Sequence, residues 1–235
     1  MRPLPMLVLL LASCAGVPQT ARTHFEGPGR FDGPLPSRML VLAAPLQAEV
    51  FDVEGFRVDE ASTEKATALA RQILADLLDE RGVSAEPTPA LGADDELLRD
   101  EWTALAGIVL DEAASYPDPL MAGPDQAAWR HKVERFDYEV GPAAWAPARL
   151  QAGTALIVTG FYVAPAAYYR DLVAFGRGYR LVLGLVDLRT GRVMRMDRLQ
   201  SRNDESRDRD FTQRMQLEPY LRELLTRLVG LGTDS

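Results

Sequence analysis

The spacing of apolar residues predicts one long amphipathic helix in the first third of the chain. Between Ser62 and Arg81 the apolar positions recur every three or four residues, as on one face of an α-helix. Ser62 is suited to cap the first turn, and Gly82 follows the last apolar residue, where helices commonly end. The predicted buried face consists of Ala66, Leu69, Ala70, Ile73, Leu74, Leu77 and Leu78.

The sequence predicts three further helices. Residues 94–114 begin with Asp94, Asp95 and Glu96, which suit the positive end of a helix dipole, and a short helix is expected from Pro124. Pro219 is expected to open the last helix, because proline is favoured in a first turn. The predicted apolar stripes are Leu98, Trp102, Leu105 and Val109 in the first helix, and Tyr220, Leu221, Leu224, Leu225, Leu228 and Val229 in the last.

Continuous apolar runs predict strands instead. Residues 37–45 form such a run, which we expect to end at Pro45, and residues 47–58 are expected to be a loop or an edge segment. Residues 154–163 are apolar on both faces and should be central in a sheet. Residues 178–188 and 192–200 form a hairpin through the turn Arg189-Thr190-Gly191. This order predicts an α/β (α+β) fold, a small mixed sheet of about three to five strands with helices packed against it.

The N-terminus has a different pattern, with an apolar run from Leu4 to Leu11 followed by Ala12, Ser13 and the single cysteine of the chain, Cys14. This order is typical of a cleaved secretory signal, residues 1–13. Leu11-Ala12-Ser13-Cys14 resembles the lipobox of bacterial lipoproteins, which implies that Cys14 carries the lipid. Residues 14–36 are rich in Gly, Pro and polar residues, which predicts a flexible tether before a single domain at 37–231.

Charge and cysteine content narrow the function classes. A formal net charge of -8 argues against nucleic acid as a partner. No second stretch approaches the ~20 apolar residues of a membrane-spanning helix. With Cys14 acylated no thiol is left for a disulfide, a metal or catalysis.

Catalytic motifs are absent from the sequence. It contains no G-x-S-x-G, P-loop, G-x-G-x-x-G or H-E-x-x-H pattern. His24 lies in the tether, and His131 lies between Arg130 and Lys132, where a solvated position is expected. We therefore expect no catalytic residue, no cofactor and no metal, although a hydrolase that uses two of the 34 acidic residues stays open.

One insertion has binding character. Residues 164–177 separate two predicted core strands, where two to five residues would suffice for a turn. The segment either covers the sheet as a short helix or contacts a partner or a membrane. Its candidate contact residues are Tyr168, Tyr169 and Phe175. Trp102, Trp129 and Trp145 are expected to be core anchors.

The order of elements resembles a known group of periplasmic lipoproteins. A lipobox and a tether precede the strand 39–45, the helix from Ser62, the strand 155–163, the hairpin Val186-Asp187-Leu188-Arg189-Thr190-Gly191-Arg192-Val193 and a last amphipathic helix. This resembles the group around the curli secretion channel CsgG, the penicillin-binding-protein activator LpoB and the TolB amino-terminal domain. The segment 94–135 is longer than the connection expected in that group. The resemblance implies an assembly or regulatory role and transfers no catalytic residue.

These observations predict a lipid-anchored cell-envelope protein that binds another envelope protein or polymer and is not an enzyme. Ala15 stands where aspartate would favour retention in the inner membrane, so the periplasmic face of the outer membrane is the expected location. A subunit of a CsgG-like oligomeric channel and a carboxylate-dependent hydrolase are the alternatives, and a homo-oligomer stays open.

Overall fold

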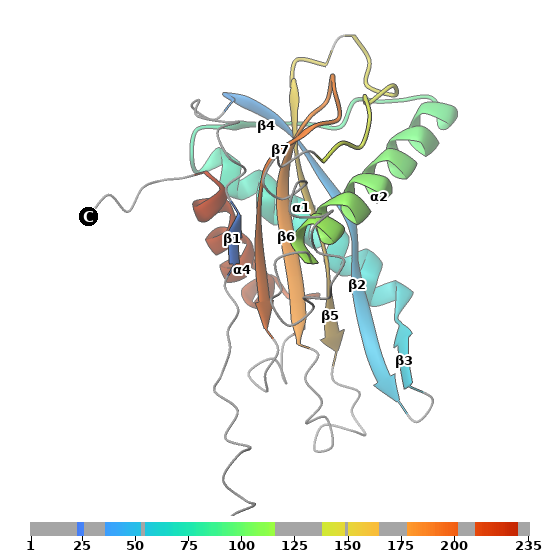
Figure 1. Ribbon diagram of the computed structural model, residues 1–235, viewed down its shortest axis with the longest axis vertical. Coiled ribbons are helices and arrows are strands. Elements are labelled where there is room, and N and C mark those ends of the chain that lie inside the picture. The colour runs from blue at the N-terminus through green and yellow to red at the C-terminus, as the bar shows by residue number, and fades with distance from the viewer. Residues whose placement is uncertain are drawn as a thin grey trace, which may run out of the picture.

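The computed structural model describes residues 23–25, 36–52, 55–115, 138–148, 150–164, 178–201 and 210–229. Within these ranges it confirms an α+β fold, in which helices pack on both faces of one open, mixed sheet (Figure 1). The elements follow one another as β1 (Thr23–Phe25), β2 (Arg38–Asp52), β3 (Gly55–Val58), α1 (Glu60–Asp79), β4 (Ser84–Glu86), α2 (Ala93–Ser115), β5 (Thr154–Ala164), β6 (Tyr179–Asp187), β7 (Val193–Ser201) and α4 (Arg214–Leu228).

The sheet has more strands than the three to five expected. Six of the described strands lie side by side in the order β1-β7-β6-β5-β2-β3. Strand β4 pairs with the start of β2, at Arg38–Leu40, whereas β3 pairs with its end, at Glu49–Asp52. Strand β2 runs parallel to β4 and β5, and the remaining pairs are antiparallel. As predicted, β5 is central and β6 and β7 form a hairpin. Strand β1 lies inside residues 14–36, which the sequence predicts to be a flexible tether. The sequence does not predict this strand, because three residues are too few to show a periodic pattern.

Strand β2 continues through Pro45 instead of ending there. The pairing of β2 with β5 shifts between Ala43 and Leu46, so β2 holds one residue more than β5 at this point, a β-bulge. Proline is tolerated at a bulge because no ladder hydrogen bond is required of it. The neighbouring amides of Leu46 and Ala48 donate to the hydroxyls of Thr67 and Thr63 on α1, each at 2.9 Å.

Helices α1 and α4 cover one face of the sheet with large aliphatic side chains. The periodicity of residues 66–78 correctly predicts the buried face of α1, except that Leu69 is only partly buried. The helix begins at Glu60 and not after Ser62, because Asp59 accepts a hydrogen bond from the Ser62 amide and acts as the cap. Helix α4 begins at Arg214, before Pro219, because Leu217 extends its buried stripe by one turn.

Helix α2 crosses the other face of the sheet diagonally (Figure 1). Its extent matches the prediction, but its predicted stripe is wrong in part: Leu98 and Leu105 are exposed, and the helix buries a different set of residues. Small residues at the contact let the helix axis approach the sheet closely. A Cβ atom on Gly107 would lie 2.5 Å from the Ala44 Cβ, and one on Gly184 would lie 2.4 Å from Leu110 Cδ2. The buried residues of α2 are Trp102, Thr103, Ala106, Gly107, Leu110, Ala113 and Ala114.

Two of the three tryptophans are core residues, as expected. Trp102 and Trp145 are buried with ring centroids 6.0 Å apart, and Trp102 Nε1 donates to the Gly141 carbonyl at 2.8 Å. Trp129 and the short helix predicted from Pro124 lie outside the described residues. Within the described ranges, no helix is both long and apolar enough to cross a membrane.

Candidate functional site: a cleft at the β2 bulge and the outer face of α2

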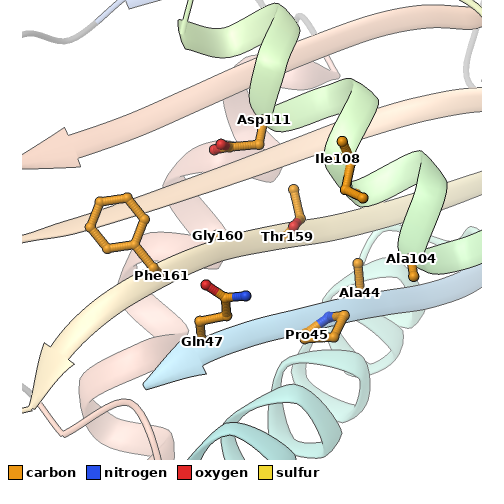
Figure 2. A pocket seen from close by; sticks show the side chains of 10 residues that line it. Ala44, Pro45, Gln47, Ala104, Ile108, Asp111, Thr159, Gly160 and Phe161 are labelled. Atoms are coloured by element: carbon orange, nitrogen blue, oxygen red, sulfur yellow. The ribbon is translucent and has the colours of Figure 1, made fainter. Parts of the chain in front are cut away.

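A cleft of about 240 Å³ lies where α2 passes over the bulge of β2 (Figure 2). Its floor comes from β2 and β5, and its wall comes from α2. Its lining contains both apolar and polar side chains. Gln47 lines the cleft, whereas its neighbours Leu46 and Ala48 face α1. The lining residues are Ala44, Pro45, Gln47, Ala104, Gly107, Ile108, Asp111, Thr159, Gly160 and Phe161.

Gly160 completes the bulge from the β5 side. Its φ of +145° is unfavourable for other residues, and a Cβ there would lie 2.0 Å from the Arg180 carbonyl oxygen. It is paired with Leu46, the first residue of β2 after the register shift. The local distortion therefore involves two adjacent strands and produces the hollow beneath α2.

A charged group lies at one end of the cleft. Arg180 on β6 is opposite Phe161 in the β5–β6 register, and its guanidinium carbon lies 5.4 Å from the Phe161 ring centroid. The Arg180 Nη1 also donates to both carboxylate oxygens of Asp111 on α2, at 3.1 and 3.2 Å. The ion pair and the cation–π contact together fix the positions of all three side chains.

A second arginine holds the C-terminal end of α2. Arg198 on β7 is 2 % exposed and donates through Nη1 to the carbonyl of Ala114. A cation there also complements the negative end of the helix dipole, since α2 has no basic residue in its own last turn. Burial, together with the neighbouring Arg180, lowers the pKa of Arg198.

The outer face of α2 is apolar although it faces away from the sheet. The exposed fractions are 60 % for Leu97, 47 % for Leu98, 46 % for Leu105 and 66 % for Ile108. Ile108 connects this face to the cleft, because it also lines the cleft wall (Figure 2). Such a cluster of exposed large apolar side chains marks an interaction surface more often than single exposed ones do.

Carboxylates surround these apolar residues. Helix α2 contains seven acidic residues and one basic residue, Arg99, which pairs with Asp100. Among the acidic residues, Asp94, Glu101 and Glu112 are exposed on the same side of the helix as Leu97 and Ile108. The outer face of α2 therefore combines an apolar stripe with negative charge.

The opposite face of the sheet contains a buried hydroxyl without a hydrogen-bond partner among the described residues, that of Tyr162. The Tyr162 ring is 2 % exposed and lies 5.0 Å from the ring of Phe211, which in turn packs near Tyr179 and Tyr220. Burial, followed by the nearby carboxylates of Asp210 and Asp59, raises the pKa of Tyr162 to about 12.

The site residues predicted from the sequence, Cys14, Tyr168, Tyr169 and Phe175, lie outside the described residues. The described part of the chain brings together no group of three or more His, Cys, Asp or Glu side chains that could hold a metal ion. Sequence reasoning missed the cleft, although two signals pointed to it. Pro45 stands at the expected end of one strand, and Gly160 lies inside the most strongly predicted strand.

The cleft and the outer face of α2 can bind apolar groups and interact with charged ones. The cleft offers the Gln47 amide, the Thr159 hydroxyl and the Asp111 carboxylate beside apolar walls. Most of the exposed apolar surface, however, lies outside it along α2, which suits an extended partner better than a small enclosed ligand. Searches found no protein-family model, no curated protein and no solved structure that matches the chain.

Proposed function

We propose that this protein is a lipid-anchored factor of the bacterial cell envelope that binds another envelope component, as an assembly or regulatory protein and not as an enzyme. The observation that carries the proposal is the order Leu11-Ala12-Ser13-Cys14 after an apolar run, with Cys14 the single cysteine of 235 residues. Two or three acyl chains on this residue anchor a protein stably, since each buried CH₂ contributes ~0.8 kcal/mol. The expected location is the periplasmic face of the outer membrane.

The contrast between the two faces of the sheet supports a binding role. Helices α1 and α4 bury most of their apolar residues and expose one large apolar side chain, Met215, whereas α2 leaves four exposed. Exposure of these side chains has a solubility cost, which a partner surface would remove. The outer face of α2, together with the cleft it borders, is the proposed docking surface.

The negative charge of α2 favours a positively charged partner. With seven acidic residues against one basic residue, the helix attracts a segment in which apolar side chains are flanked by Lys or Arg. A second copy of this chain fits poorly, because a symmetric contact would bring carboxylates of both helices together. We therefore assign a basic, amphipathic segment of another envelope protein to this surface.

A substitution at the proposed lipid acceptor tests the anchor. Cys14→Ser removes the sulfur that would take the lipid, and the protein should move from the membrane fraction to the soluble periplasmic fraction. Ser13→Ala is the matched control, because a small residue is kept beside the cleavage site and the protein should stay in the membrane. A Cys14→Ser protein that remains in the alkaline-washed membrane pellet would contradict the proposal.

A further inference from the structure

Strand β1 is the first described part of the chain after Cys14, and it is paired with β7. Thr23 lies opposite Arg198, and Phe25 lies opposite Met196. Only eight residues, 15–22, separate Cys14 from this strand. Fully extended, they span about 30 Å, whereas the stretch from Cys14 to Arg38 would span about 80 Å. Pairing of β1 with β7 therefore removes more than half of the reach of the tether.

The direction of β1 decides where the chain enters the domain. Because β1 is antiparallel to β7, its first residue, Thr23, is the residue of β1 nearest to Ser201, the C-terminal end of β7. Ala164 at the end of β5 and Tyr179 at the start of β6 lie at this same end of the sheet. The turn at Thr190 and the start of α2 lie at the opposite end (Figure 1).

We propose that β1 fixes the orientation of the domain on the bilayer, with the end that carries Ala164, Tyr179 and Ser201 toward the lipid surface. This inference rests on the proposed lipid anchor at Cys14. In the opposite orientation the chain would have to turn back from Arg198 to Val193, about 17 Å along β7, and half of the available length would be used. The near end is therefore held within about 30 Å of the membrane.

This orientation places the end of β5 and the start of β6 nearest the membrane. Ala164 at the end of β5 and Gly178, which precedes β6, both belong to the end that faces the lipid. The start of α2, in contrast, lies at the far end. The docking surface on α2 would thus be presented away from the membrane for most of its length, where a partner can approach it.

Two spacer insertions distinguish this arrangement from a free tether. A ten-residue Gly/Ser spacer between Arg22 and Thr23 lengthens the chain before β1, and the same spacer between Gly29 and Arg30 lengthens it after β1. The full lipidated chain is reconstituted in vesicles that carry fluorescent acceptor headgroups. A donor dye is placed on Val58→Cys, at the near end, or on Arg189→Cys, at the far end; both positions are exposed.

The expected result is higher energy transfer from position 58 than from position 189. The first spacer should lower the transfer, with an outward shift of up to about 17 Å, and the second should leave it unchanged. Equal effects of the two spacers, or equal transfer from the two labels, would overturn the orientation while the anchor stands. Failure of the protein to float with the vesicles would overturn the anchor and the orientation together.

Discussion

The two faces of the sheet are covered in different ways. On one face, α1 and α4 fully bury Leu, Ile and Ala side chains, and of their large apolar residues Met215 is exposed. On the other face, α2 buries Trp102 and Leu110 and otherwise approaches the sheet through small residues such as Gly107, while four of its large apolar side chains are exposed. The leucines that α1 and α4 bury stabilise the fold, whereas the leucines that α2 leaves exposed are available to a partner.

The largest expected difference between the two faces is in the free energy of unfolding after a side chain is truncated. Leu77→Ala on α1 removes a fully buried side chain and should lower the free energy of unfolding by about 2–5 kcal/mol. Ile108→Ala on α2 removes a side chain that is 66 % exposed and should change it by less than about 0.5 kcal/mol. Urea denaturation followed by circular dichroism measures both. A similar loss for the two variants would show that Ile108 belongs to the core.

A smaller effect is expected where α2 touches the sheet. Gly107→Ala places a Cβ against Ala44, and overpacking should cost about 1–3 kcal/mol, offset by up to about 1 kcal/mol from the higher helix propensity of alanine. The double variant Gly107→Ala/Ala44→Gly should recover part of the loss. Gly153→Ala is the control, because no atom lies within 4 Å of its added Cβ. Equal costs for Gly107→Ala and Gly153→Ala would argue against close contact of α2 with the sheet.

The smallest effect concerns a polar atom in the otherwise apolar α1/α4 face. Tyr162→Phe removes a buried hydroxyl that has no hydrogen-bond partner among the described residues, so stability at neutral pH should stay equal or rise by up to about 1 kcal/mol. A clear loss of stability would mean that the hydroxyl is hydrogen-bonded in solution.

The same tyrosine predicts a pH dependence. Its pKa in the folded state, about 12, is above the usual value of 10, so folding favours the protonated form. The associated stability is complete below pH 10 and is lost as the pH rises toward 12. The wild-type protein should therefore lose more stability than Tyr162→Phe across this interval, as measured by urea denaturation at each pH. Parallel curves for the two proteins would contradict the raised pKa.

The elements with the most regular patterns could be predicted from the sequence. The buried face of α1, the central strand β5 and the β6–β7 hairpin follow directly from periodicity and turn residues. The buried side of α2 could not be predicted, because this helix is apolar on several sides. Burial there depends on which side has residues small enough for close approach, such as Ala106 and Gly107.

The cleft depends on contacts between residues that are distant in the chain. Asp111, Phe161 and Arg180 meet because α2 crosses the sheet at the bulge and because β5 and β6 adopt one particular register. No local pattern specifies that meeting. From the sequence alone, Pro45 indicates the end of a strand, because a proline disrupts the pairing of a regular strand. The strand continues because a β-bulge accommodates this proline.

We propose that the outer face of α2 binds an envelope partner and that the α4 side does not. A photo-crosslinking amino acid in place of Ile108, and the same residue in place of Met215 on α4, compares two exposed apolar positions, 66 % and 86 % exposed. In intact cells, position 108 should crosslink to one envelope protein through a peptide rich in Lys or Arg and apolar residues, and position 215 should not. Equal crosslinking at both positions, no crosslink at 108, or a crosslink from 108 to a second copy of this chain would contradict the account.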